Sequence, residues 1–402
     1  MRILTRLAIG ATFSVLGSHC ALAQESIKIG VLTDMASGFS AWSGRGSVIA
    51  AEMAAEDFKK TSGNSSQKIE ILSADHQNKA DTASSIARRW LAENGVNAIV
   101  DVPNSAAALA VNFIVRSSNA VFLSSGGGSD ALTGKECSPN TVQWTFDLYS
   151  LARSTATAAV ERGGDSWYFI TADYAGGHGL ERIATNFVTQ SGGKVLGHSL
   201  PALNSLDYSP FLLQAQASKA KIVGFGMAGA DLMTAIKQAG EFGIAAGGQN
   251  LVALAIFIND IHGLGLKAAH GLVFTTAFYW DLDDGKRAFA KRFAERNNGN
   301  YPSQVQAGVY AAVLHYLKAT VALGSRNGAD VVAKMKAMPT DDPLFGNGEI
   351  RIDGRHLHDM YVAEVKSPEE SKAPWDYLKI LKTIPAKEAF RAASAEECSL
   401  VK

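Results

Sequence analysis

The feature that most constrains this chain is a regular alternation of strand-like and helix-like segments. Short runs rich in β-branched and aromatic residues, beginning with Ile27–Leu32, are separated by stretches with apolar residues at helical spacing, such as 47–60. One series of these units ends near Ser124, and a second series begins at Trp167. Two successive series of βα units predict an α/β protein with two doubly wound parallel-sheet lobes, each with helices on both faces.

The alternation also predicts where a ligand would bind. In open α/β sheets, ligands bind beyond the carboxyl ends of the strands, so two facing sheets place the site between the lobes.

The 38 basic and 38 acidic residues balance. A near-neutral chain lacks the electrostatic footprint for nucleic acid or an anionic membrane. We therefore expect a small-molecule ligand and no nucleic-acid partner.

The first residues have the three parts of a secretory signal. Arg2 and Arg6 form a charged start, 7–16 is a short apolar stretch, and 21–23 is an A-x-A cleavage site. We expect residues 1–23 to be removed, which leaves 36 of the 38 basic residues against 38 acidic ones. Cys20 allows an alternative, a lipid anchor, but His19 precedes it where a small residue is usual.

Two cysteines remain after that cleavage, Cys137 and Cys398. In an oxidising compartment an even pair predicts one disulfide, and the export signal places the chain there. Such a bond would fasten the carboxyl-terminal tail to the first half of the chain.

Two turns follow strands of the first series. Asn104 and Ser105 stand where a helix begins, so the free N–H groups of its first turn could bind an anion, although ordinary N-capping uses the same residue types. The next strand ends in Gly126, Gly127 and Gly128, where the backbone could approach a ligand closely, unless the turn is merely flexible.

The segment 224–229 matches G-x-G-x-x-G, the dinucleotide-binding motif. That motif also needs an acid at the end of the following strand, and Leu251–Ile256 contains none. The match lies deep in the second series rather than at its first βα turn. We predict that no nucleotide binds there and that Met227 or Ala228 lies near the ligand instead.

Neither a metal site nor a catalytic constellation is evident. His356 and His358 could share one strand face, but a metal needs further ligands in recognisable spacing, so a polar turn is expected. The motifs G-x-S-x-G, H-E-x-x-H and the P-loop are absent from the sequence. We expect no cofactor and no metal.

Several aromatic residues fall in predicted loops or at strand ends, among them Trp42, Tyr174 and the run 278–280. Aromatic side chains usually pack in a core. Three in a row cannot all face one core, so at least one of the run should line a cleft or the surface.

The order and spacing of several motifs resemble the leucine/isoleucine/valine-binding protein family of ABC importers, the type I periplasmic binding proteins. The resemblance covers essentially the whole chain after residue 23, and it rests on the segments 27–38, 102–105, 123–127, 172–177 and 236–240. Segments 278–281 and 306–310 are similar to a subgroup associated with the import of aromatic acids.

The resemblance implies three crossings between the lobes, near Phe146, Ala277 and Phe345. The expected first lobe is then 24–146 plus 278–345, and the second is 147–277 plus 346–402. In this family a ligand carboxylate is bound at the turns that correspond to Asn104-Ser105 and Gly126–Gly128. A tyrosine, here Tyr174, closes over the ligand. The expected ligand-binding residues are Trp42, Asn104, Ser105, Gly126, Gly127, Gly128, Tyr174, Met227, Ala228 and Phe278.

One position departs from the family pattern. In the amino-acid binders a glutamate follows the strand corresponding to Leu251–Leu254 and receives the α-amino group, whereas Ala253–Phe257 is apolar. Burying an unpaired ammonium costs several kcal/mol. We therefore favour an aromatic or otherwise apolar carboxylate over leucine. Asp260 or backbone carbonyls could still hold an amine, which keeps the amino-acid alternative open.

The sequence thus predicts a monomeric periplasmic protein that captures a small carboxylate between two lobes and delivers it to an ABC permease. A ligand sensor on the same fold, which presents its closed state to a receptor, is the alternative. An enzyme is disfavoured because no catalytic constellation is present.

Overall fold

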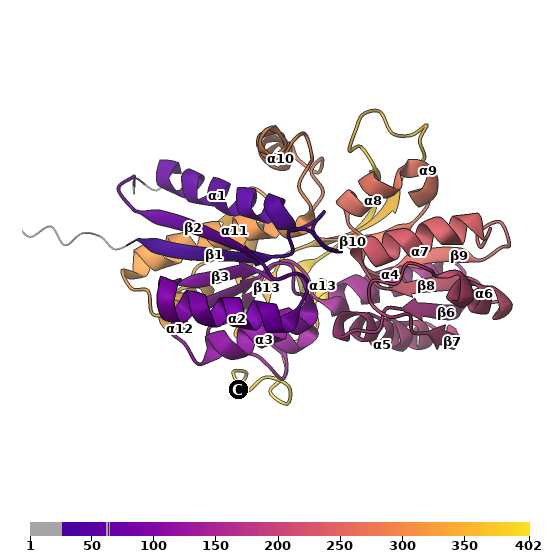
Figure 1. The fold of residues 1–402 in the computed structure, drawn as a ribbon, viewed down its shortest axis with the longest axis horizontal. Helices are drawn as coiled ribbons and strands as arrows, with labels where there is room; N and C mark the ends of the chain where they lie inside the picture. Colours follow the sequence, from indigo (N-terminus) through magenta and orange to yellow (C-terminus); the bar gives the residue numbers. More distant parts are fainter. Residues whose placement is uncertain (1–25, 62, 64) are drawn as a thin grey trace, which may run out of the picture.

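The structure is a computed structural model that describes residues 26–61, 63 and 65–402 (Figure 1). It forms two α/β lobes side by side, with the amino-terminal segments and much of the orange part of the chain in one lobe. The expectations for residues 1–23, including the cleavage site and Cys20, lie outside the described residues.

The first lobe is built on a parallel sheet of strand order β2-β1-β3-β4-β5. Its strands are β1 (Ile27–Thr33), β2 (Ile69–Asp75), β3 (Ala98–Asp101), β4 (Val121–Ser124) and β5 (Thr141–Gln143). Helices from two parts of the sequence cover it: α1 (Gly44–Thr61), α2 (Ala80–Arg89), α3 (Ser105–Arg116), α10 (Asp284–Arg296), α11 (Gln304–Leu323) and α12 (Gly328–Ala337). The central strand β1 is buried almost throughout because helices lie on both faces, as parallel sheets require.

The second lobe repeats the design with a parallel sheet of order β7-β6-β8-β9. The strands are β6 (Ser166–Thr171), β7 (Lys194–Ser199), β8 (Ile222–Gly226) and β9 (Asn250–Ala253). Its helices are α4 (Leu148–Glu161), α5 (Ala175–Gln190), α6 (Ser209–Ala217), α7 (Gly229–Glu241), α8 (Ile258–Leu264) and α9 (Leu266–Ala269). A separate antiparallel sheet holds β10 (Val273–Thr276), β14 (Met360–Val365) and β15 (Leu378–Ile384). The predicted fold of two parallel-sheet lobes is confirmed.

The small sheet of β11 (Thr340–Asp342), β12 (Gly346–Ile350) and β13 (His356–Leu357) packs beside the first lobe. Gln143 at the end of β5 pairs with Arg355, and α12 contacts β12. Only from Met360 does the chain join β10 of the second lobe. We infer that the third crossing lies near Asp359 rather than near Phe345, whereas the ends of β5 and β10 fit crossings near Phe146 and Ala277.

The predicted disulfide joins Cys137 and Cys398, whose Cα atoms are 5.7 Å apart. It returns the end of the chain, which follows α13 (Ala386–Ala389), to the first lobe across a sequence separation of 261 residues. Arg391 supports the same return by donating to the backbone oxygen of Asp130 at 3.3 Å. The expected role of the bond as a fastener for the tail is consistent with this position.

His356 and His358 do not form the expected polar turn, because both are buried at the crossing. The His356 ring stacks on Trp144 at 4.1 Å, and His358 Nε2 lies 2.6 Å from the carbonyl oxygen of Thr145. Burial lowers the pKa of both, that of His358 to about 4, so they are neutral at physiological pH. Two neutral rings therefore pack the hinge.

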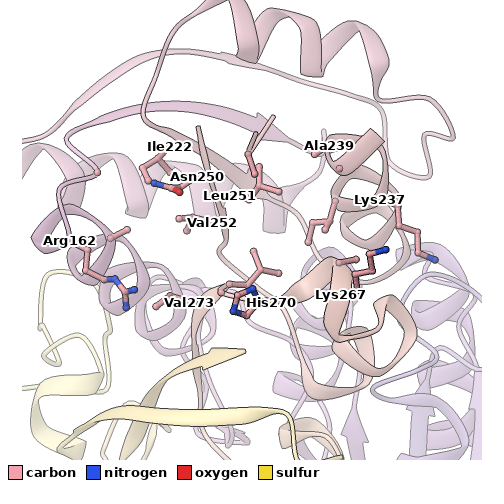
Figure 2. A pocket seen from close by; sticks show the side chains of 18 residues that line it. Arg162, Ile222, Lys237, Ala239, Asn250, Leu251, Val252, Lys267, His270 and Val273 are labelled. Atoms are coloured by element: carbon pink, nitrogen blue, oxygen red, sulfur yellow. The ribbon is translucent and has the colours of Figure 1, made fainter. Parts of the chain in front are cut away.

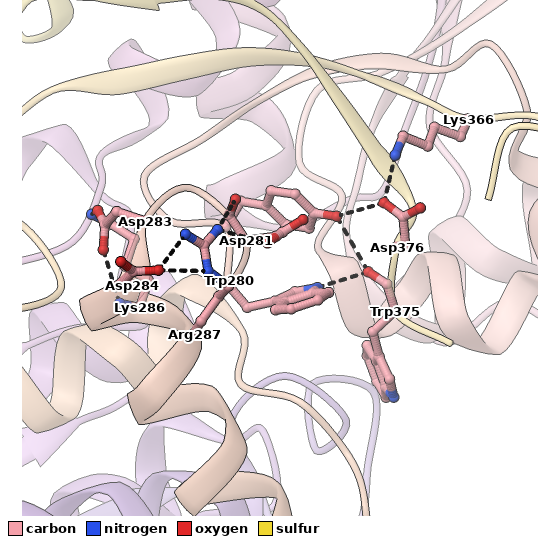
Figure 3. Close-up of polar contacts among 10 residues, drawn as sticks. Trp280, Asp281, Asp283, Asp284, Lys286, Arg287, Lys366, Trp375 and Asp376 are labelled. Carbon is pink, nitrogen blue, oxygen red and sulfur yellow. Dashed lines mark hydrogen bonds and ion pairs between the residues drawn. The ribbon is translucent and has the colours of Figure 1, made fainter. Parts of the chain in front are cut away.

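The aromatic run 278–280 anchors the second crossing rather than lining a ligand cavity. Phe278 packs in the first-lobe core against Phe289. Trp280 is partly exposed at the surface, and its Nε1 donates to the backbone oxygen of Trp375 at 2.8 Å (Figure 3). The segment that Trp280 contacts is itself held by an ion pair between Lys366 and Asp376 at 2.5 Å.

Among the described residues, no single helix is long and apolar enough to cross a membrane. Helices α11 and α12 meet the length and composition test only as a pair, and they are bent by 105°. Most of α11 is buried in the first-lobe core.

Candidate functional site

The turn from β3 into α3 forms one wall of the cleft between the lobes. Asn104 is the N-cap of α3, and its Oδ1 accepts from the N–H of Ala107 at 3.0 Å. Just before it, Asp101 and Val102 have φ values of 83° and 57°, a left-handed conformation that costs non-glycine residues about 1–3 kcal/mol each. Strain of this kind concentrates at functional sites, and here it aims the first turn of α3, with Ser105, at the cleft.

The glycine turn after β4 lies beside α3. A side chain on Gly126 would come within 2.6 Å of an Asp101 carboxylate oxygen, and one on Gly128 within 2.8 Å of the Phe146 ring. Gln143 holds the turn rigid because its Nε2 donates to the backbone oxygen of Gly127 at 3.0 Å. Glycine is therefore required here for close approach, and the alternative of a merely flexible turn does not fit these contacts.

The second lobe presents two helix starts to the same cleft. Tyr174 precedes α5 and Ala228 precedes α7, and neither helix has a side-chain cap. Burial raises the pKa of the Tyr174 phenol, so it remains a neutral hydroxyl. Apolar side chains and uncapped N–H groups thus face the first lobe from this side.

These walls enclose a cavity of about 30 Å³ between the lobes. Thirteen residues line it: Phe39, Trp42, Pro103, Ser105, Gly126, Gly128, Phe146, Leu148, Tyr174, Leu180, Ala228, Ala255 and Phe257. None of them is charged. A space of this size holds about two water molecules, so a larger ligand needs the lobes to separate or the aromatic walls to move.

Aromatic side chains supply most of the lining. The Trp42 ring lies 4.9 Å from Phe39 and 4.7 Å from Phe257, and Phe257 lies 5.7 Å from Phe146. Trp42 Nε1 is buried and has no hydrogen-bond partner among the described residues. Because an unpaired buried donor costs about 1–3 kcal/mol, this N–H is available to an acceptor on a ligand.

Six of the ten predicted ligand-binding residues meet in this cavity: Trp42, Ser105, Gly126, Gly128, Tyr174 and Ala228. Asn104 and Gly127 support its first-lobe wall without lining it. Met227 and Phe278 lie in the cores of the second and first lobes. Of the two alternatives for the segment 227–228, only Ala228 lines the cavity.

Four lining residues were not predicted from the sequence: Phe39, Leu148, Leu180 and Pro103. Phe146 was predicted only to mark a crossing between the lobes, and it also lines the cavity. Phe39 follows a turn in which both carboxylate oxygens of Asp34 accept hydrogen bonds, including one from the Phe39 N–H at 2.8 Å. An acid followed by small residues after a strand signals such a turn, although it does not tell which way the next ring points.

The glycines of 224–229 serve packing. A side chain on Gly224 would meet the Phe169 ring at 2.8 Å, and one on Gly229 would meet the Gly38 carbonyl oxygen at 2.2 Å. Glycine is therefore needed at Gly224 for close contact between neighbouring strands and at Gly229 for close contact between the lobes. The absence of nucleotide binding stays a prediction.

Two acids lie buried close to the cleft without lining it. Burial raises the pKa of Asp101 to about 7, against the opposing effect of the Ser47 and Thr33 hydroxyls. Burial also raises the pKa of Asp260 to about 7, although its Oδ2 accepts from the Phe257 N–H at 3.0 Å. Phe257 lines the cavity, so Asp260 lies behind the cavity wall and contacts it through this hydrogen bond.

Among the described residues, no group of three His, Cys, Asp or Glu could hold a metal.

A family model described as periplasmic binding protein matches residues 26–372. A periplasmic binding protein from Burkholderia mallei is 44% identical, with 94% of this chain and 99% of that one covered and a TM-score of 0.89. A branched-chain amino acid ABC transporter periplasmic ligand-binding protein from Burkholderia xenovorans is 35% identical, with 91% and 97% covered and a TM-score of 0.79. No curated protein matches the chain.

A more distant solved structure has the same fold. The solute-binding protein of an ABC transporter from R. palustris, in complex with benzoate, is 18% identical, with 90% of this chain and 97% of that one covered and a TM-score of 0.79. At this identity the likeness concerns the fold alone.

Proposed function

The chain belongs to the periplasmic binding protein family, and from that premise we propose that it captures an aromatic or otherwise apolar carboxylate between its lobes for an ABC importer. The family places the protein in the periplasm, gives it a small-molecule ligand and a permease partner, and consists of solute-binding proteins rather than enzymes. The chemistry of the ligand and a monomeric state are our proposals.

The uncharged, aromatic-lined cavity between the lobes carries the proposal. Trp42, Phe146 and Phe257 offer flat apolar surface, and aromatic pairs gain about 0.5–1.5 kcal/mol beyond their burial. An α-ammonium group would find no carboxylate at this surface. Asp260 is separated from it by Phe257 and would have to ionise and move to serve as a partner.

The carboxylate of the ligand would lie at the start of α3. The Ser105 hydroxyl and the free N–H groups of the first turn favour an anion there, and the helix dipole adds to this preference. The unpaired Nε1 of Trp42 supplies a further donor in the same cavity. The cavity thus combines a few hydrogen-bond donors with aromatic walls, which suits a ring that carries one carboxylate.

Capture would proceed by closure of the lobes. Only the closed form contacts a ligand from both sides, so ligand binding shifts the population toward it. The cavity of about 30 Å³ corresponds to a closed arrangement in which the aromatic walls touch one another. A ligand ring would take the place of some of these contacts.

Competitive calorimetry tests the proposal. We expect benzoate and 4-hydroxybenzoate to bind and leucine and phenylalanine to bind at least 10-fold more weakly. Tight binding of the amino acids without binding of the aromatic acids would contradict the ligand class while leaving the family assignment intact.

A pair of serine variants locates the carboxylate. Ser105→Ala should weaken benzoate binding about 10-fold or more, because a hydrogen bond to a charged group contributes about 1.5–3 kcal/mol. Ser118→Ala, at the other end of α3, should leave affinity unchanged, since that hydroxyl donates to the Val115 carbonyl oxygen away from the cleft. Equal effects of the two variants would exclude the α3 start as the carboxylate site.

A further inference from the structure

The second lobe contains another cavity, of about 530 Å³, which is not part of the interlobe cleft. Its lining includes Ile222, Asn250 and Val273, which stand at or near the amino ends of β8, β9 and β10. The interlobe cavity is lined instead by residues that follow strand ends, such as Ala228 and Ala255. The two cavities therefore lie at opposite ends of the second-lobe strands. A volume of this size is typical of pockets that hold small organic molecules.

The cavity exists because the second-lobe sheet opens between β9 and β10. β9 pairs only with β8, and β10 pairs only with β14, in two separate sheets of the described chain. Figure 2 shows Leu251 and Val252 on one side of the gap and Val273 on the other. The turn after α9, with His270, closes the bottom of the gap in this view.

The lining combines apolar side chains with cations. Ile222, Ile236, Leu251, Val252 and Val273 form the apolar part. The titratable lining residues are Arg162, Lys237, Lys267 and His270, and no aspartate or glutamate is among the lining residues. Basic groups around a low-dielectric hollow focus a positive potential into it and concentrate anions.

The two lysines are the cations without a competing partner. Lys237 and Lys267 lie on the same side of the cavity in Figure 2, and neither has a hydrogen bond or ion pair among the described residues. Arg162, on the opposite side, already forms an ion pair with Glu364 at 3.0 Å. An anionic group would therefore be attracted most strongly to the lysine side.

We propose that this cavity is a second small-molecule site that binds an amphipathic organic anion. Its carboxylate lies beside Lys237 and Lys267, and its apolar body lies in the gap between β9 and β10, against Leu251 and Val252. This site is independent of the cleft ligand, because it shares no lining residue with the interlobe cavity.

Octanoate is a suitable probe, with octylamine and octanol as matched cationic and neutral probes of the same chain length. We expect calorimetry to give binding of octanoate and at least 10-fold weaker binding of the other two. The double variant Lys237→Glu/Lys267→Glu should weaken octanoate at least 10-fold, and both side chains are exposed, so folding should be preserved. The control Lys135→Glu/Lys291→Glu makes the same charge change at two exposed positions of the first lobe and should leave binding unchanged.

Octanoate could bind in the interlobe cleft instead, and variants of the two sites distinguish these locations. Octanoate binding that Trp42→Ala abolishes and the double lysine variant leaves intact would place the probe between the lobes and overturn the second site. No octanoate binding at millimolar concentration would overturn it as well. Lysine-dependent self-association in gel filtration would show that a second copy of the chain covers this face, which also contradicts a small-molecule site. Benzoate binding in the cleft should persist in the double lysine variant whichever result is obtained.

Discussion

The carbonyl oxygen of Gly38 accepts a hydrogen bond from the backbone N–H of Ala230, with the two atoms 3.1 Å apart. Gly38 belongs to the loop between β1 and α1 of the first lobe, and Ala230 to the first turn of α7 in the second. A backbone bond between the lobes at the edge of the cleft forms only when they are closed. A second link, the Arg182–Asp130 ion pair at 3.1 Å, joins α5 to the first lobe, but it contributes little because the Arg182 side chain is 59% exposed.

Gly229→Ala should hold the lobes apart. An alanine Cβ there would come within 2.2 Å of the Gly38 carbonyl oxygen, and backbone atoms cannot yield as a flexible side chain can. We expect at least 10-fold weaker ligand binding and, in small-angle scattering with saturating ligand, a larger radius of gyration than the unmodified protein.

Gly243→Ala is the matched control for that variant. Gly243 has φ +64°, close to the +62° of Gly229, and its nearest neighbour would be an Ala246 side chain at 3.9 Å. Both variants carry the same backbone strain, but only Gly229→Ala blocks closure. Indistinguishable affinities would mean that the Gly38–Ala230 contact does not control closure.

The strands and the βα order were predictable because parallel strands are buried on both faces and give continuous apolar runs. The run Ile27–Leu32 lies within β1, and Ile222–Phe225 lies within β8. Helix α4 and strand β15 were not predicted. α4 is rich in Ser, Thr and Ala, and β15 has only its two end residues buried, so neither has a strong apolar pattern.

Trp42→Ala should reduce affinity for an aromatic ligand about 10-fold or more, because it removes the ring between Phe39 and Phe257. Trp42→Phe keeps a ring and removes Nε1, so its affinity should lie between those of the unmodified protein and Trp42→Ala. The difference from the unmodified protein measures what the Nε1 donor contributes to binding. Phe113→Ala is the control, since that ring is 62% exposed. Calorimetry gives the affinities, and unchanged affinity in Trp42→Ala would exclude this cavity as the binding site.

Breaking the Cys137–Cys398 bond should loosen the tail and leave the lobes folded. A bond that closes so long a loop contributes about 2–4 kcal/mol, and the tail has few other anchors besides Arg391. In Cys398→Ser we expect a lower melting temperature and rapid trimming of the tail in limited proteolysis. A reductant should reproduce the effect in the unmodified protein and add nothing in the variant. A melting temperature that is insensitive to reductant would contradict this role.

The cleft itself was predictable only in part. Residues at strand ends, such as Ser105 and Gly126, follow from topology, because carboxyl ends of parallel strands meet at one edge. Phe39 and Phe257 come from loops whose direction depends on tertiary contacts, and periodicity does not report these. The same limit applies to His356 and His358: a polar pair in the sequence became a buried, neutral pair because the chain crosses between lobes there.

Asp101→Asn should make the protein more stable at neutral and higher pH. Burial raises the pKa of Asp101 from 3.8 to about 7 in the folded state, so the folded protein holds this proton more tightly than the unfolded chain. The resulting stability is fully present below about pH 4 and is lost as the pH rises through 7, by on the order of 4 kcal/mol for a shift of this size. An asparagine carries no charge to bury, so the melting temperature should rise relative to the unmodified protein at pH 8. The rise should be smaller at pH 5, where only about 1.6 kcal/mol of this stability has been lost. Asp165→Asn is the control, because a hydrogen bond from Lys221 lowers the pKa of that exposed carboxyl and gives a small effect of opposite sign. A melting temperature that falls equally at both pH values would mean that the folded state requires the Asp101 carboxylate as an acceptor.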